Sequence, residues 1–162
     1  MAAWQFTICL IPKVWASIEK YNVELLYDED DRYDTTDAWV NNQPVSYIKE
    51  IISKYFEAAS SWDKELFCWG NEEETDVNLW YENGIVFDIS IRLDLRAPLT
   101  DTISKIVTLA NELSCVVFIP GQKQIIEPNE HILMSFAKSS SASLFVNKPD
   151  DFFKAVSKKH NK

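Results

Sequence analysis

The spacing of apolar side chains at every second position over residues 85–96 is the feature that most constrains the fold of this chain. Every second position is apolar, and the intervening positions from Asp88 onwards are polar or charged. The apolar set is Ile85, Phe87, Ile89, Ile91, Leu93 and Leu95. Because strand side chains point alternately to two faces, this pattern predicts a strand with one apolar and one polar face.

Residues 75–81 alternate in the same way and predict a partner strand. The Asn83-Gly84 pair suggests a two-residue turn, but that register would place Leu79 opposite Asp88 and mix the two faces. A three-residue loop, Glu82-Asn83-Gly84, would place Leu79 opposite Phe87 and keep the apolar side chains together. We therefore predict a bulged hairpin over about 75–96, with the glycine of the loop in the left-handed conformation.

The rest of the chain predicts short strands and amphipathic helices, with no internal repeat and no linker. Alternation at 4–11 indicates a strand with one buried side. Further elements are expected as strands at 66–69 and 115–119, an edge strand at 144–146, and helices at 45–56, 100–113, 129–136 and 147–156. Thr100, Asn129 and Asn147 are the expected N-caps of the last three helices. Together they predict one α+β domain over residues 1–162, with a mainly antiparallel sheet packed by three to four helices.

Charge and large aromatic residues are distributed unevenly along the chain. All six Trp and all six Tyr lie within the first 81 residues. That half carries 6 Lys/Arg against 16 Asp/Glu, a net charge of −10, whereas the second half carries 10 against 9, a net of +1. Trp and Tyr often anchor protein interfaces, and carboxylates steer basic partners. The asymmetry therefore indicates binding of a basic protein.

Composition argues against several other function classes. A net charge of −9 disfavours binding to nucleic acid, because phosphate contacts need a basic surface. With only three glycines, the chain has neither glycine-rich nucleotide-binding signature, and we expect no cofactor. The start has no basic segment before an apolar core, and no apolar run is long enough to span a membrane. Three widely spaced cysteines suit free thiols in a reducing compartment, so we expect a cytoplasmic protein.

Metal-ligand spacing is absent from the sequence. Asp28, Asp30 and Asp34 are spaced somewhat like a calcium loop, but the twelfth position of that template is Trp39 instead of Glu. Zinc is disfavoured because His131 and His160 are far apart and no cysteine is near either. We expect no metal site.

Catalytic chemistry is also not indicated. The three cysteines, Cys9, Cys68 and Cys115, lie in apolar segments and are expected to be small core residues. His131 is expected at the surface, and no pair of carboxylates is singled out by spacing. We therefore predict that the protein is not an enzyme.

The candidate partner-binding residues are two acidic segments and two tryptophans. Trp39 follows the first acidic segment and Trp80 lies on the polar face of the hairpin, so both are expected to be exposed, whereas Trp4 and Trp69 are expected in the core. The full set is Asp28, Asp30, Asp31, Asp34, Asp37, Trp39, Glu72, Glu73, Glu74 and Trp80.

A third surface, the polar face of the long strand, has two interpretations. Arg92, Asp94 and Arg96 alternate in sign at two-residue steps. The pattern is explained either by cross-strand ion pairs on a solvated sheet face or by a face that binds a partner.

The chain resembles the small, acidic, cysteine-poor immunity proteins of bacterial toxin–immunity systems, such as those of contact-dependent growth inhibition. The resemblance rests on single-domain size, the aromatic and acidic stretch Tyr27–Trp39, the Glu72–Glu74 run and the Arg92–Arg96 pattern followed by a helix and a short strand. It implies one-to-one neutralisation of a cognate toxin, often a basic nuclease. Two alternatives stay open: an acidic nucleic-acid mimic or regulatory adaptor, and a small-ligand or carbohydrate-binding domain whose Trp and Tyr stack on sugars.

Overall fold

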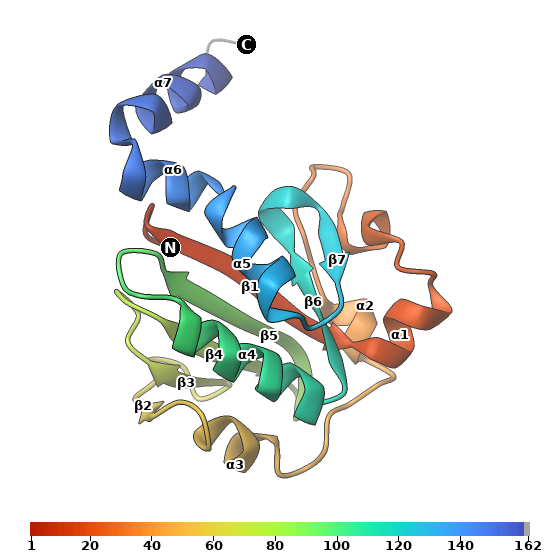
Figure 1. The fold of residues 1–162 in the computed structure, drawn as a ribbon. Helices are drawn as coiled ribbons and strands as arrows, with labels where there is room; N and C mark the ends of the chain where they lie inside the picture. Colours follow the sequence, from red (N-terminus) through yellow and green to blue (C-terminus); the bar gives the residue numbers. More distant parts are fainter. Residues whose placement is uncertain (161–162) are drawn as a thin grey trace.

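The protein, described by a computed structural model over residues 1–160, is built on one seven-stranded sheet (Figure 1). The strand order is β2-β3-β4-β5-β1-β6-β7, and every neighbouring pair is antiparallel. The strands are β1 (Gln5–Pro12), β2 (Ala58–Ala59), β3 (Leu66–Gly70), β4 (Asp76–Glu82), β5 (Ile85–Asp94), β6 (Cys115–Ile119) and β7 (Gln124–Ile126). This confirms the predicted α+β class with an antiparallel sheet. Residues 161–162, which the predicted domain includes, lie outside the described range.

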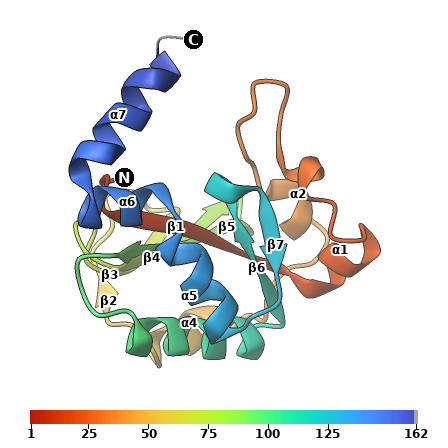
Figure 2. The same cartoon turned by 45° about the horizontal axis from the view of Figure 1, so that its top comes forward.

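Seven α-helices occur within residues 1–160, more than the three to four predicted. They are α1 (Lys13–Ile18), α2 (Thr36–Trp39), α3 (Ile48–Ser53), α4 (Thr100–Glu112), α5 (Glu130–Lys138), α6 (Ser141–Asn147) and α7 (Pro149–His160), with 3-10 turns η1 (Val23–Leu26) and η2 (Pro120–Gln122). Helices α3, α4 and α5 contribute buried residues to the main core, with α4 and α5 in front of the sheet in Figure 1. Helix α7 extends away from the sheet (Figure 2).

The interior strand β1 is buried on both faces over most of its length. It lies between β5 and β6 and is antiparallel to both, so those two strands run parallel and need the α4 crossover between them. Ile8 and Leu10 belong to the main core, whereas Cys9 and Ile11 belong to a second cluster with α1 and α2 on the other side of the sheet. The expectation of a single buried side for residues 4–11 is therefore wrong.

The hairpin of β4 and β5 forms as predicted, but its turn and bulge differ. Glu82 pairs with Ile85, so the turn has two residues, and both Asn83 (φ 53°) and Gly84 (φ 78°) are left-handed. The bulge lies farther along: Tyr81 pairs with Val86 while Trp80 pairs with Asp88, which leaves Phe87 as the extra residue. The predicted three-residue loop is wrong, although the left-handed glycine is confirmed.

The bulge changes which side chains reach the core. Val86 is buried there, whereas Ile85 is 41% exposed and Phe87 packs beside Trp80. A bulge supplies one unpaired residue, so the alternation restarts out of phase behind it. The apolar face predicted to begin at Ile85 therefore holds only from Ile89 onwards.

Several expected boundaries also need correction. The segment 144–146 is part of helix α6, capped by Ser140, and is not an edge strand. Asn129 caps α5 by accepting from the Ile132 N–H, as predicted. Asn147 instead ends α6, and Thr100 is the first residue of α4, which has no side-chain cap.

Candidate partner-binding surface

The side of the sheet opposite α4 has a region that the second cluster leaves partly exposed. That cluster covers β1 and β6 through α1 and α2. On β1, β3, β4 and β5, the strand registers place the side chains that point to this side of the sheet next to one another. We call this region the open face. Its residues are Thr7, Cys68, Asp76, Asn78, Trp80, Asp88, Ser90 and Arg92. Met1 lies against it, accepting a hydrogen bond at Sδ from the Thr7 hydroxyl.

A cross-strand ion pair occupies the end of the open face next to the β3–β4 connection. Arg92 on β5 and Asp76 on β4 are directly opposed, and Arg92 donates from Nε to Asp76 Oδ1 at 2.8 Å and from Nη2 to Oδ2. The hydrogen bonds to Asp76 raise the pKa of Arg92, and the nearby Glu72 carboxylate adds to the effect. A cross-strand ion pair therefore accounts for Arg92, although its partner Asp76 is buried instead of solvated.

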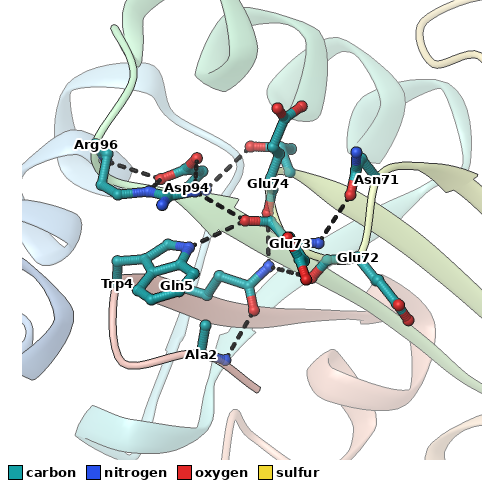
Figure 3. Close-up of polar contacts among 10 residues, drawn as sticks. Ala2, Trp4, Gln5, Asn71, Glu72, Glu73, Glu74, Asp94 and Arg96 are labelled. Atoms are coloured by element: carbon teal, nitrogen blue, oxygen red, sulfur yellow. Dashed lines mark hydrogen bonds and ion pairs between the residues drawn. The ribbon is translucent and has the colours of Figure 1, made fainter.

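The Glu72–Glu74 segment, which we call the acidic turn, connects β3 to β4 at one end of the open face (Figure 3). Side chains hold its backbone carbonyls. Trp4 Nε1 donates to Glu73 O at 3.0 Å, and Gln5 Nε2 donates to Glu72 O at 2.9 Å and Glu74 O at 2.6 Å. The backbone of the acidic turn is thus fixed by the start of β1.

Arg96 completes this support from the end of β5. Its Nη2 donates to Glu73 O at 2.9 Å, while Nε and Nη2 each hold an Asp94 carboxylate oxygen at 2.9 Å. The guanidinium also stacks 4.1 Å from the Trp4 ring centroid. Hydrogen bonding from Arg96 lowers the pKa of Asp94, whose side chain is almost fully buried.

The carboxylates of the acidic turn take no part in this support. Figure 3 shows those of Glu72 and Glu74 directed away from the hydrogen-bonded centre. All three glutamates are exposed, and none forms an ion pair with a residue in the described part of the chain. The turn therefore presents three unpaired carboxylates on a fixed backbone.

Local chain geometry also fixes the acidic turn. Gly70 has φ +82°, and a Cβ at this position would lie 2.2 Å from Thr75 O. The Asn71 N–H donates to Thr75 O at 3.1 Å, and Asn71 Oδ1 accepts from the Glu73 N–H at 2.9 Å. Only glycine combines that backbone angle with such a close approach.

The segment 28–34, which we call the acidic loop, is largely neutralised from within. Asp28 accepts from the backbone N–H groups of Asp30 and Arg32, which lowers its pKa. Arg32 also forms ion pairs with Asp28 at 3.2 Å and Asp30 at 3.1 Å, and Lys123 pairs with Asp31 at 2.6 Å. The loop is exposed, as expected, but three of its five carboxylates already have cationic partners.

The end of the acidic loop is attached to the other end of the open face. Thr35, directly after Asp34, donates from its hydroxyl to Asp88 Oδ1 at 2.6 Å and approaches Phe87 O at 2.9 Å. Desolvation raises the pKa of Asp88 to about 6. Asp88 and Arg92 are four residues apart on β5, roughly 14 Å along the strand, so the two acidic segments border opposite ends of the open face. Asp37 lies beyond Thr35, exposed in the first turn of α2.

The tryptophans are arranged differently from expectation. Trp39 is 1% exposed and donates from Nε1 to Leu10 O, so the expectation that it is exposed is wrong. Trp69 is buried as predicted, whereas Trp4 is only half-buried. Trp80 is partly exposed and contacts Trp62, which is 78% exposed. Sequence reasoning missed Trp62, although its polar neighbours Ser60, Ser61, Asp63 and Lys64 signalled exposure.

A cavity of about 760 Å³ lies between the acidic loop and the start of α6, lined in part by Gln5, Tyr33 and Ser140. Its cationic lining residues, Arg32 and Lys123, are paired with carboxylates of the acidic loop. Both cationic side chains that line the cavity are therefore already paired.

Residues 1–160 hold no group of three His, Cys, Asp or Glu side chains able to bind a metal ion, and the side chain of His160 is outside the described part. All three cysteines are free, and burial raises the pKa of the Cys9 and Cys115 thiols, the latter to about 12. None of the helices described is long and apolar enough to cross a membrane. No family model matches the chain, and neither does any curated protein or solved structure.

Proposed function

We propose that this protein is an immunity protein that binds and neutralises a cognate basic toxin domain, with the acidic turn as its main contact. The observation that carries the proposal is the set of three unpaired carboxylates on a backbone held by Trp4, Gln5 and Arg96. A fixed backbone loses little conformational entropy on binding, so its charge is available at low cost in free energy.

The acidic loop has a secondary role in this proposal. Its carboxylates are mostly paired within the chain, so they add to the long-range field more than to direct contacts. The field steers a basic partner towards the open face and raises the association rate at low ionic strength. Free cysteines fit the reducing cytoplasm, where such a protein would meet an incoming toxin.

The test is an affinity purification from the source cells with the wild-type protein and a Glu72→Gln/Glu73→Gln/Glu74→Gln variant. The wild type should recover a basic protein, and the variant should bind it at least about tenfold more weakly, because charge pairs at interfaces are worth a few kcal/mol. The matched control neutralises three exposed acids elsewhere, Glu130, Asp150 and Asp151, and should bind like the wild type.

Function is then tested by co-expression of the recovered protein with each variant. The wild type and the control should protect the cells, and the acidic-turn variant should not. Recovery of no basic protein, or full protection by the acidic-turn variant, would contradict the proposal.

A further inference from the structure

Three aromatic side chains stack at the end of the open face that is remote from the acidic turn. The ring of Trp80 contacts Trp62 edge to face, with centroids 5.7 Å apart, and packs against Phe87 at 6.2 Å. Leu66, directly opposite Trp80 on β3, is buried although it belongs to neither core cluster. Trp80 therefore has a buried side chain as its cross-strand neighbour, whereas Trp62 is 78% exposed.

Four half-buried aromatic side chains of this protein have a cation of their own. Lys49 lies over Phe67 and Tyr81, Arg96 over Trp4, and Lys123 over Tyr27. Within residues 1–160, no Lys or Arg lies over Trp62 or Trp80. Tryptophan is the aromatic side chain that attracts cations most strongly. Trp62 is thus the most exposed tryptophan and has no cation from the described part of the chain over its ring.

The charges around the stack complement a cation. Asp88 is the direct cross-strand neighbour of Trp80, and Asp63 follows Trp62 in sequence. Asp76, Asn78 and Trp80 point to the same side of β4, so the stack and the acidic turn border one surface. A basic segment lying along β4 would meet carboxylates at one end and the tryptophan pair at the other.

We propose that Trp62 and Trp80 form the docking site for an arginine side chain of the basic partner. This inference rests on the proposed function and names the second anchor of the same surface. Arginine suits the site better than lysine because its planar guanidinium stacks on an aromatic face while its donors reach a carboxylate such as Asp88. Trp62 covers the apolar part of that side chain.

The experiment uses an octa-arginine peptide and 15N-labelled tryptophan indoles in the full chain at low salt. The indole signals of Trp62 and Trp80 should shift on titration, while those of Trp39 and Trp69, which are hydrogen-bonded in the interior, should not. Trp62→Ala should weaken peptide binding about three- to tenfold. Tyr47→Ala, which removes an aromatic side chain 57% exposed just before α3, should change it less than about twofold.

The outcomes separate this inference from the proposed function. If Glu72→Gln/Glu73→Gln/Glu74→Gln abolishes peptide binding while Trp62→Ala binds like the wild type, the aromatic docking site is wrong and the immunity function stands. If Trp62→Ala weakens binding but no basic protein is recovered from cells, the docking site stands and the immunity function fails. Indole shifts of Trp62 with cellohexaose and none with octa-arginine would overturn the inference in favour of sugar binding.

Discussion

Arg96 donates a hydrogen bond across 2.9 Å to the backbone carbonyl of Glu73, 23 residues earlier in the chain. The same guanidinium is held by Asp94 and stacked on Trp4. One cation thus fixes the direction of a turn whose own carboxylates are negative. The Arg96 guanidinium pairs with a backbone carbonyl and not with the side chains of the acidic turn. The three glutamate carboxylates therefore stay available to the proposed partner.

Replacing Arg96 should loosen the acidic turn without unfolding the protein. We expect Arg96→Gln to speed hydrogen exchange at the Glu73 and Glu74 amides about tenfold, because the hydrogen bond that holds the Glu73 carbonyl is lost. Global stability should change little, since the Arg96 side chain is 47% exposed and its ion pair with Asp94 is screened by solvent. Unchanged exchange at these amides would show that Trp4 and Gln5 suffice.

Gly70→Ala should destabilise the protein by more than about 2 kcal/mol, because the new Cβ meets Thr75 O at 2.2 Å in a left-handed backbone. Urea denaturation measures the change. Gly121→Ala is the matched control: its Cβ would meet nothing within 4 Å, and its cost should stay below about 0.5 kcal/mol. Equal midpoints for the two variants would disprove the close approach.

Gly84→Val should cost more than about 1 kcal/mol, although nothing lies within 4 Å of a Cβ there. The cost comes from φ +78°, which a β-branched residue resists. Chemical denaturation at one pH is sufficient. A neutral Val variant would mean that the turn adopts another type in solution.

Asp88 should make stability fall as pH rises. Its folded pKa is about 6, above its ordinary value near 3.8, so between these values the folded state binds the proton that the unfolded state has lost. The contribution of Asp88 to the free energy of unfolding should therefore decrease from about pH 4 to about pH 6. Asp88→Asn should remove it and stabilise the protein by about 1–2 kcal/mol at pH 7.5.

Asp94→Asn should show the opposite pH dependence. For both variants, the free energy of unfolding is measured by urea denaturation at a series of pH values. Arg96 lowers the folded pKa of Asp94, so its contribution is present above the unfolded pKa and is lost as pH falls through the folded value. The Asn variant should lose stability at neutral pH and approach the wild type in acid. Parallel pH profiles for the two variants would contradict both assignments.

Thiol titration should find three reactive cysteines per chain after denaturation without reductant, because all three are free. In the native protein only Cys68 should react at an appreciable rate, since Cys9 and Cys115 are buried. Recovery of one thiol would reveal a disulfide and contradict the cytoplasmic assignment.

Local pattern predicted most of the elements because periodicity is a property of neighbouring residues. The hairpin, the α4 helix and the Asn129 cap follow from spacing within about ten residues. The bulge at Phe87 did not follow, because Ile85, Val86 and Phe87 are all apolar and the sequence does not show which of them is unpaired. Ile85 was therefore predicted on the apolar face of the hairpin, although its side chain is 41% exposed.

The candidate surface could be predicted only in part. Acidity and exposure of the Glu72–Glu74 run were visible in the sequence, but its support by Trp4, Gln5 and Arg96 depends on contacts across about 20 to 70 residues. Trp39 was misjudged for the same reason, since its partner Leu10 lies 29 positions away. Pairing of the acidic loop with Lys123 likewise needed the fold.

The position of Met1 against Thr7 determines how this protein should be handled at the bench. Any sequence fused to the amino group starts beside the open face, where it would compete for space with the proposed partner. The far end of α7 lies away from the sheet in both views (Figures 1 and 2). Affinity tags, fluorophores and surface-immobilisation handles therefore belong at the carboxyl end.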